Sequence, residues 1–238
     1  MSKRTDLVFE ETALQLGKIL SALIGVEPTP PGPGPGPQPV THENTILRYS
    51  GGITREYNIE GCLGYPEEFS YEKNGLVAIE IGTKVTEIGN ATFSQCPDLT
   101  SVAFPFIESD EAYYSIGSWA FGDCPNLSAI VLTENCISIG DSSFSQCPLL
   151  TAVTFPHSLL DGGSIGGDGW AFGGDTAALI DITLVGMTKA WCLNDGVGYI
   201  NNIGPSQEQD CIIHCTDGDL ICRWDEDDWE YKVLELNQ

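Results

Sequence analysis

Positive charge is scarce in this sequence. Its 238 residues include 10 Lys and Arg against 34 Asp and Glu, a formal net charge of -24, and no Lys or Arg lies between Lys84 and Lys189. Nucleic-acid phosphates and anionic lipid headgroups repel such a chain. We therefore expect neutral or cationic partners and no nucleic acid.

Long apolar runs are also missing. No segment reaches the ~18 consecutive apolar residues of a membrane-spanning helix, so no membrane insertion is expected. Near the N-terminus, Asp6, Glu10, Glu11 and Lys18 interrupt the stretch that a secretion signal keeps apolar. The sequence therefore predicts no ordinary secretion signal.

Catalytic motifs are absent as well. The three histidines lie far apart, no Gly-x-Ser-x-Gly element occurs, and no glycine-rich phosphate loop follows a strand and opens a helix. We expect neither an enzyme nor a cofactor.

Metal-binding patterns are weak. The segment "CIIHCTDGDLIC" (211–222) holds three cysteines and His214, but its spacing fails the common zinc patterns. A capping strand followed by a turn at Asp217 and Gly218 is favoured over a zinc site. The acidic run "DEDDWE" (225–230) lacks the spacing of a calcium loop and is interpreted as a solvated face. No metal is expected.

The N-terminal residues 1–27 have the pattern of one amphipathic helix, followed by a Pro/Gly linker at 28–40 that reaches about 40 Å if it is mostly polyproline II. The apolar stripe needs a partner, so the sequence predicts attachment to a capsid or virion, or self-association. Its residues are Phe9, Ala13, Leu16, Leu20 and Leu23.

Alternating residues on both sides of Ser50-Gly51-Gly52 predict a β-hairpin cap, placed at 41–63. A repeat follows it. Phe93, Phe121, Phe144 and Phe172 recur with the same apolar positions around them, and such a period is typical of a solenoid. We predict a mainly β solenoid of about four to five coils at 64–188, with a C-terminal cap and acidic tail at 189–238.

Other residues recur at fixed places in the repeat. The glycine after each repeated Ile is interpreted as a corner that needs positive φ. Cys96, Cys124 and Cys147 share one position, which predicts a ladder of buried thiols rather than disulfides or metal ligands.

The segment "VTEIGNATFSQCPDLTSVAFP" (85–105) resembles the BspA-like leucine-rich repeat, and "IGSWAFGDCPNLSAIVL" and "SIGDSSFSQCPLLTAVTFP" resemble it too. The resemblance covers roughly residues 76–184. It implies a leucine-rich-repeat solenoid of a surface or adhesion type, and it brings no catalytic motif.

The segment between each repeated strand and the next Ile-Gly varies in length, so the insertions should line one edge of the solenoid, which is often the binding face. The expected ligand-binding aromatics are Tyr113, Tyr114, Trp119 and Trp170. Exposed aromatic residues beside carboxylates suit glycan or protein contacts, and packing beneath the insertions is the alternative.

Together these features predict a non-catalytic binding or adhesion protein with a glycan or protein on a host surface as its partner. Display on a tether without a secretion signal favours a bacteriophage virion fibre or decoration protein at the virion surface. A bacterial cell-surface or secreted adhesin and an intracellular scaffolding module remain as alternatives.

Overall fold

A computed structural model describes residues 39–64, 71–108, 112–166, 170–173, 179–194, 196–203 and 209–235. The chain divides into two compact units, Met1–Gly34 and Pro35–Gln238, and all described residues lie in the second. The predicted N-terminal helix and most of the linker lie outside the described residues.

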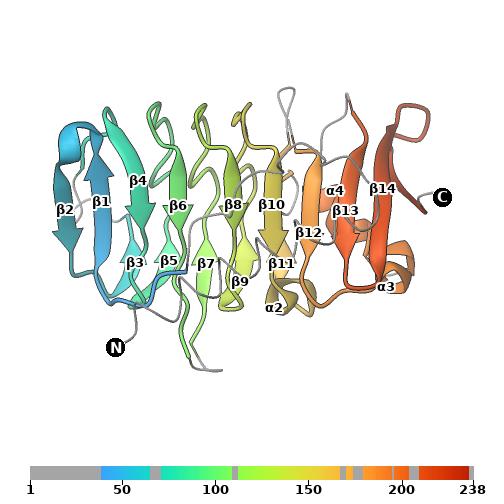
Figure 1. Cartoon of the computed structure of the whole chain (residues 1–238), viewed down its shortest axis with the longest axis horizontal. Coiled ribbons are helices and arrows are strands. Elements are labelled where there is room, and N and C mark those ends of the chain that lie inside the picture. Colours follow the sequence, from blue (N-terminus) through green and yellow to red (C-terminus); the bar gives the residue numbers. More distant parts are fainter. Residues whose placement is uncertain are drawn as a thin grey trace, which may run out of the picture. The chain divides into compact units, whose positions relative to one another are not determined.

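The second unit is a β-solenoid in which each coil gives one strand to each of two faces (Figure 1). One face holds a four-stranded sheet, β2-β1-β4-β6, and a six-stranded sheet, β15-β14-β13-β12-β10-β8. The other face holds the five-stranded sheet β11-β9-β7-β5-β3. The predicted mainly β, leucine-rich-repeat solenoid is thus confirmed.

The strands of the first face are β1 (Thr45–Tyr49), β2 (Thr54–Tyr57), β4 (Leu76–Glu80), β6 (Ser101–Ala103), β8 (Ala129–Val131), β10 (Ala152–Phe155), β12 (Asp181–Leu184), β13 (Cys211–Cys215), β14 (Gly218–Asp225) and β15 (Glu230–Glu235). Those of the second face are β3 (Gly61–Leu63), β5 (Val85–Ile88), β7 (Tyr114–Ile116), β9 (Cys136–Ile139) and β11 (Ser164–Ile165). Short helices follow as α2 (His157–Leu160), α3 (Lys189–Asn194) and α4 (Val197–Ile203).

In-register pairing turns the repeated apolar positions into columns. On the first face, Ile130, Val153, Ile182 and Ile213 are direct partners in successive parallel strands. On the second face, the column consists of Leu63, Ile88, Ile116, Ile139 and Ile165. Because all of these side chains are buried, neighbouring coils complete one another's core.

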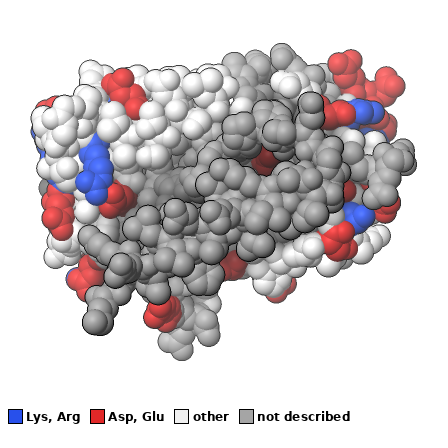
Figure 2. Space-filling model, viewed as in Figure 1, with Lys and Arg blue, Asp and Glu red and all other residues white. Residues whose placement is uncertain are grey.

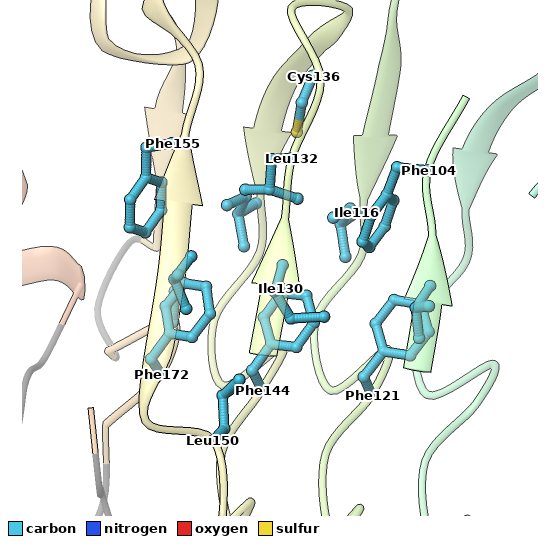
Figure 3. Packing of buried hydrophobic residues seen from close by; sticks show 14 of the residues in the cluster. Phe104, Ile116, Phe121, Ile130, Leu132, Cys136, Phe144, Leu150, Phe155 and Phe172 are labelled. Carbon is cyan, nitrogen blue, oxygen red and sulfur yellow. The ribbon is translucent and has the colours of Figure 1, made fainter. Parts of the chain in front are cut away.

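The repeated phenylalanines form a stack inside the solenoid (Figure 3). Ring centroids lie 5.5 Å apart between Phe93 and Phe121, 5.3 Å between Phe121 and Phe144, and 4.7 Å between Phe144 and Phe172. All three pairs are nearly parallel. The invariant Phe of the repeat is therefore the centre of the core, as its spacing predicts.

The cysteine ladder has the predicted form. The thiol of Cys124 donates to the Phe93 carbonyl at 3.3 Å, and that of Cys147 donates to the Phe121 carbonyl at 3.4 Å. Each of these two thiols thus forms a hydrogen bond to the backbone of the preceding coil. Burial raises the pKa of Cys147 to about 11, which keeps it protonated at neutral pH.

The glycines after the repeated Ile meet the expectation only in the fourth coil, where Gly166 has a φ of 57°, and not at Gly89, Gly117 and Gly140. Gly117 does not adopt positive φ; a Cβ there would lie 2.6 Å from Asn90 Oδ1 and 2.8 Å from Asn90 N, so close contact between coils requires the glycine. Positive φ occurs instead at non-glycine residues of the following turns. These are Ala91, Trp119 and Ser142 at one repeat position, and Gln95, Asp123 and Gln146 at another.

Both ends of the solenoid carry antiparallel strands. At the N-terminal end, β1 and β2 form the predicted hairpin, and β1 also pairs with β4. At the C-terminal end, β13 extends the parallel sheet and turns back into β14 as predicted, and β15 follows as an edge strand. The helices α3 and α4 and the strand β15 were not foreseen from the sequence.

Candidate binding surface

Three connections at the same corner of successive coils differ in length. They join β6 to β7 (104–113), β8 to β9 (132–135) and β10 to β11 (156–163), and the last contains α2. Figure 1 shows α2 and the β6–β7 connection at the lower edge of the solenoid. The predicted edge of insertions is present.

The middle connection holds the other two in place. The buried Asn135 side chain accepts from Ile107 N at 2.8 Å and donates to the carbonyls of Ile107 and Ala112 at 3.1 and 2.9 Å. Glu134 accepts from the backbone N–H groups of His157 and Ser158 at 3.3 and 3.2 Å. One short segment therefore fixes both longer neighbours.

These connections form an open groove of about 480 Å³, here called the insertion groove. Aromatic, carboxylate, amide and imidazole side chains meet in it. The lining residues are Phe106, Ile107, Glu108, Tyr113, Glu134, Asn135, His157 and Ser158. Sequence reasoning identified only Tyr113 among them, although the insertion lengths located the edge itself.

The neighbouring tyrosines have opposite environments. Tyr113 is 42% exposed and lines the insertion groove. Tyr114 is 1% exposed and stacks on Phe104 with ring centroids 5.8 Å apart. Its hydroxyl oxygen lies 3.3 Å from Thr133 Oγ1. Burial also raises the pKa of Tyr114. The expectation of an exposed Tyr114 was wrong, because alternation along β7 turns its side chain into the core.

Trp119 lies in a second groove, here called the tryptophan groove, of about 230 Å³. This groove shares no lining residue with the insertion groove. Its lining residues are Ala91, Ser94, Gln95, Trp119, Gly122, Asp123 and Gln146. Tyr113 precedes β7 and Trp119 follows it, so the two predicted residues lie beyond opposite ends of that strand.

The indole of Trp119 lies over the backbone of its own coil. A Cβ at Gly122 would be 2.4 Å from Trp119 Cε3, so the glycine makes room for the ring. Trp119 is 41% exposed. Gln95, Asp123 and Gln146 share one repeat position, and this signal could have identified them from the sequence.

Trp170 is a packing residue. Its ring centroid lies 5.9 Å from that of Trp224 and 6.3 Å from that of Tyr231, both in the C-terminal hairpin. The side chain is half-buried. Trp170 therefore packs against the C-terminal hairpin, a contact different from the packing beneath the insertions that was the alternative.

The basic side chains of the described residues belong to the two ends of the solenoid. Arg48 pairs with Glu80 at 2.6 Å near the first strands, and Arg223 pairs with Asp210 at 2.6 Å near the last. On the face in Figure 2, Lys and Arg appear only toward the two ends. No Lys or Arg is among the lining residues of either groove, but Lys73 lies beside the tryptophan groove and donates to the Ser94 carbonyl at 2.6 Å.

The C-terminal histidine serves the fold. His214 Nδ1 lies 2.8 Å from Asp219 and Nε2 lies 3.5 Å from Asp181. Cys211 and Cys222 are direct partners across β13 and β14 and are buried. Within the described ranges, no group of His, Cys, Asp and Glu residues could hold a metal ion. Among those residues, no helix is long and apolar enough to cross a membrane.

The predicted attachment residues lie outside the described part of the chain. These are Phe9, Ala13, Leu16, Leu20 and Leu23.

Comparison with protein families identifies the repeat. Residues 64–165 match six copies of the family described as BspA type Leucine rich repeat region. This stretch is thus similar to the BspA-type leucine-rich repeat, which agrees with the resemblance noted from the sequence. The repeat is a binding or scaffold fold, and the family is consistent with adhesion-type binding. Comparison with curated proteins and with solved structures gave no significant match.

Proposed function

We propose that this protein is a non-catalytic, surface-displayed adhesion module that binds a glycan or protein of a host surface. The observation that carries this proposal is the insertion groove. Three connections are fixed to one another by the buried Asn135 and by Glu134, and they present the exposed aromatics Phe106 and Tyr113 beside carboxylates. Exposed aromatics in a preformed groove are typical binding residues.

The chemistry of this groove favours a protein partner with neutral or basic character. Glu108, Glu134 and Tyr113 line it, and the surrounding coils have no Lys or Arg. A cationic surface is therefore attracted and a neutral one is not repelled, whereas an acidic surface is repelled.

Display on a virion is the setting that we propose, as a fibre or decoration protein of a bacteriophage. The Pro/Gly-rich segment at 28–40 and the apolar stripe that precedes it support attachment of the repeat region to a particle or to other copies. A bacterial cell-surface or secreted adhesin is the second candidate, and an intracellular scaffold is the third.

Binding is tested by adding labelled full-length protein to intact bacterial cells and comparing it with the variants Phe106→Ala and Tyr113→Ala. The proposal expects saturable binding that falls in both variants while their melting temperatures stay close to that of the unchanged protein. Leu149→Ala, at an exposed position outside the groove, is the matched control. Binding that is equal in all four proteins contradicts the assignment of the insertion groove.

Localisation is tested with an antibody against the repeat region. Labelling of virus particles purified from the source culture supports the virion proposal. Labelling of intact cells supports the adhesin, and labelling only after lysis supports the intracellular scaffold.

A further inference from the structure

The tryptophan groove has features that the repeat itself does not require. At the position of Trp119, the neighbouring coils carry Ala91 and Ser142, with φ of 54° and 55° against 58° for Trp119. The backbone therefore accepts a small residue there equally well. A large indole at this place is an addition to the repeat, and the left-handed conformation is a property of the coil.

The ring and the backbone beneath it form one unit. Trp119 and Trp170 are each followed three residues later by a glycine, Gly122 and Gly173, on which the indole lies. In the fourth coil the C-terminal hairpin packs against Trp170. In the second coil no ring contact with another described aromatic residue covers Trp119, so an aromatic face stays open to solvent.

A row of polar side chains runs beside this face. Gln95, Asp123 and Gln146 occupy equivalent positions in three successive coils, and with coils ~4.8 Å apart the row is about 10 Å long. None of the three side chains forms a hydrogen bond or ion pair with the described residues, so their donors and acceptors are available to a ligand. Two amides and one carboxylate together offer both kinds of group.

We propose that Trp119 and the row of Gln95, Asp123 and Gln146 form a binding site for a neutral oligosaccharide of hexopyranose units. The C–H face of a sugar ring packs on the indole, and its hydroxyls exchange hydrogen bonds with the amides and the carboxylate. The row crosses several coils, which suits a short chain of sugars better than a single one.

The charge of the surroundings selects among glycans. Asp123 lies in the groove, no Lys or Arg is among the lining residues, and the nearby Lys73 ammonium donates to the Ser94 carbonyl at 2.6 Å. Anionic glycans are therefore disfavoured. Two neutral amides also distinguish the groove from a site for arginine-rich peptides, in which further carboxylates would be expected.

The site rests on the proposed binding function, but it is a separate groove with separate residues. It is tested with the full-length protein and a panel of neutral trisaccharides of glucose, mannose or galactose. Saturation-transfer NMR detects binding, and isothermal titration calorimetry gives the dissociation constant for the unchanged protein and for each variant. A sulfated disaccharide and an arginine-rich peptide complete the panel.

The expected result is saturation transfer to ring protons of at least one neutral trisaccharide, with affinity lowered at least about tenfold by Trp119→Ser. Trp229→Ser is the matched control, since Trp229 is 79% exposed and also has positive φ, yet lies in the hairpin turn after β14. It should leave affinity unchanged. Gln95→Ala and Gln146→Ala should each weaken binding without changing the melting temperature.

Three results would overturn the site: no neutral trisaccharide binds at millimolar concentration, Trp119→Ser binds as well as the unchanged protein, or only the arginine-rich peptide binds. The failure of the site and that of the proposed function are distinguishable. If cells are still bound through Phe106 and Tyr113 while no sugar is, only the oligosaccharide site is lost.

Discussion

Stacking of the repeated phenylalanines concentrates much of the core in a few side chains. Phe121 lies between Phe93 and Phe144, with centroids 5.5 and 5.3 Å away, and it also meets Phe104 edge-on at 6.0 Å. Its ring thus packs against aromatic rings of the coils before and after its own. Removing it leaves a cavity that no neighbouring side chain can fill without breaking the stack.

We expect Phe121→Ala to lower the free energy of unfolding by ~3–5 kcal/mol, as large-to-small changes in a core do. Leu149→Ala is the control, because Leu149 is 53% exposed and its loss should cost under about 0.5 kcal/mol. Chemical denaturation of both variants measures the difference. A cost below about 1 kcal/mol for Phe121→Ala would mean that the stack is not the core.

The close contact between coils at the repeat glycines can be tested by substitution with alanine. Gly117→Ala places a Cβ 2.6 Å from Asn90 Oδ1 and should destabilise, because backbone atoms of Asn90 leave little room to move. Gly198→Ala, in α4 with nothing within 4 Å, should instead stabilise by up to about 1 kcal/mol through helix propensity. Thermal unfolding of the two variants should therefore shift in opposite directions. Equal shifts would contradict the contact.

The core residues could be predicted from the sequence, whereas most residues that line the candidate grooves could not, and the reason is physical. Phe121 and Cys124 repeat because each must meet its equivalent in the next coil. Tyr114 looked like part of an insertion, but it is the first residue of β7 and faces inward. The role of Asn135 could not be predicted from the sequence, because its hydrogen-bond partners Ile107 and Ala112 come near it only in the folded chain.

At the scale of elements, the periodicity of the sequence predicts the coils, whereas much of the structure at the two ends of the solenoid is not predicted by it. The hairpin of β1 and β2 was foreseen from its turn residues, and β13 and β14 from the Asp217-Gly218 turn. Helices α3 and α4 are short, and their positions are set by packing on the last coils rather than by a repeat. The acidic run at 225–230 is largely the turn between β14 and β15, and the sequence predicts only a C-terminal cap and acidic tail where β15 lies.

The C-terminal strands contain a pH-dependent contact. Partial burial lowers the pKa of His214, but the hydrogen bond to Asp219 and the charge of Asp181 outweigh it, so the net pKa is raised. A raised folded-state pKa adds stability that is complete below the unfolded value of about 6.5 and is lost as pH rises through the folded value.

We therefore expect the protein to melt at a higher temperature than His214→Gln at pH 5.5, and the gap to shrink by pH 8.5. Scanning calorimetry of both proteins across this range measures the gap, and using the difference cancels the effect of the other titrating groups. His157→Gln, at an exposed residue of another coil, is the control. A gap that widens with pH would contradict the raised pKa.

At the scale of the whole molecule, the proposed display depends on the segment that precedes the solenoid. The sequence predicts a helix there whose apolar stripe spans little more than two heptads. Because an isolated helix of this length is marginal in water, we expect it to pack on a partner. If several copies associate, they present several solenoids together and bind with avidity.

We expect residues 41–238 to sediment as a folded monomer, and the full chain to be oligomeric or bound to a particle. Analytical ultracentrifugation of both proteins checks this. Replacing Leu16 and Leu20 with Ser in the full chain should return it to the monomer. A full chain that is monomeric, and is found in neither a virion nor a cell-surface fraction, would remove the support for a fibre or decoration protein.

The confinement of basic residues to the two ends also determines how proteases act on the chain. Trypsin cleaves only after Lys and Arg, so the stretch from 85 to 189 offers no internal cleavage site, whether folded or unfolded. Cuts at Lys84 or Lys189 remove an end of the solenoid and leave both grooves in one fragment. In an environment rich in trypsin-like enzymes, the part of the chain that carries both grooves is therefore the last to be cleaved.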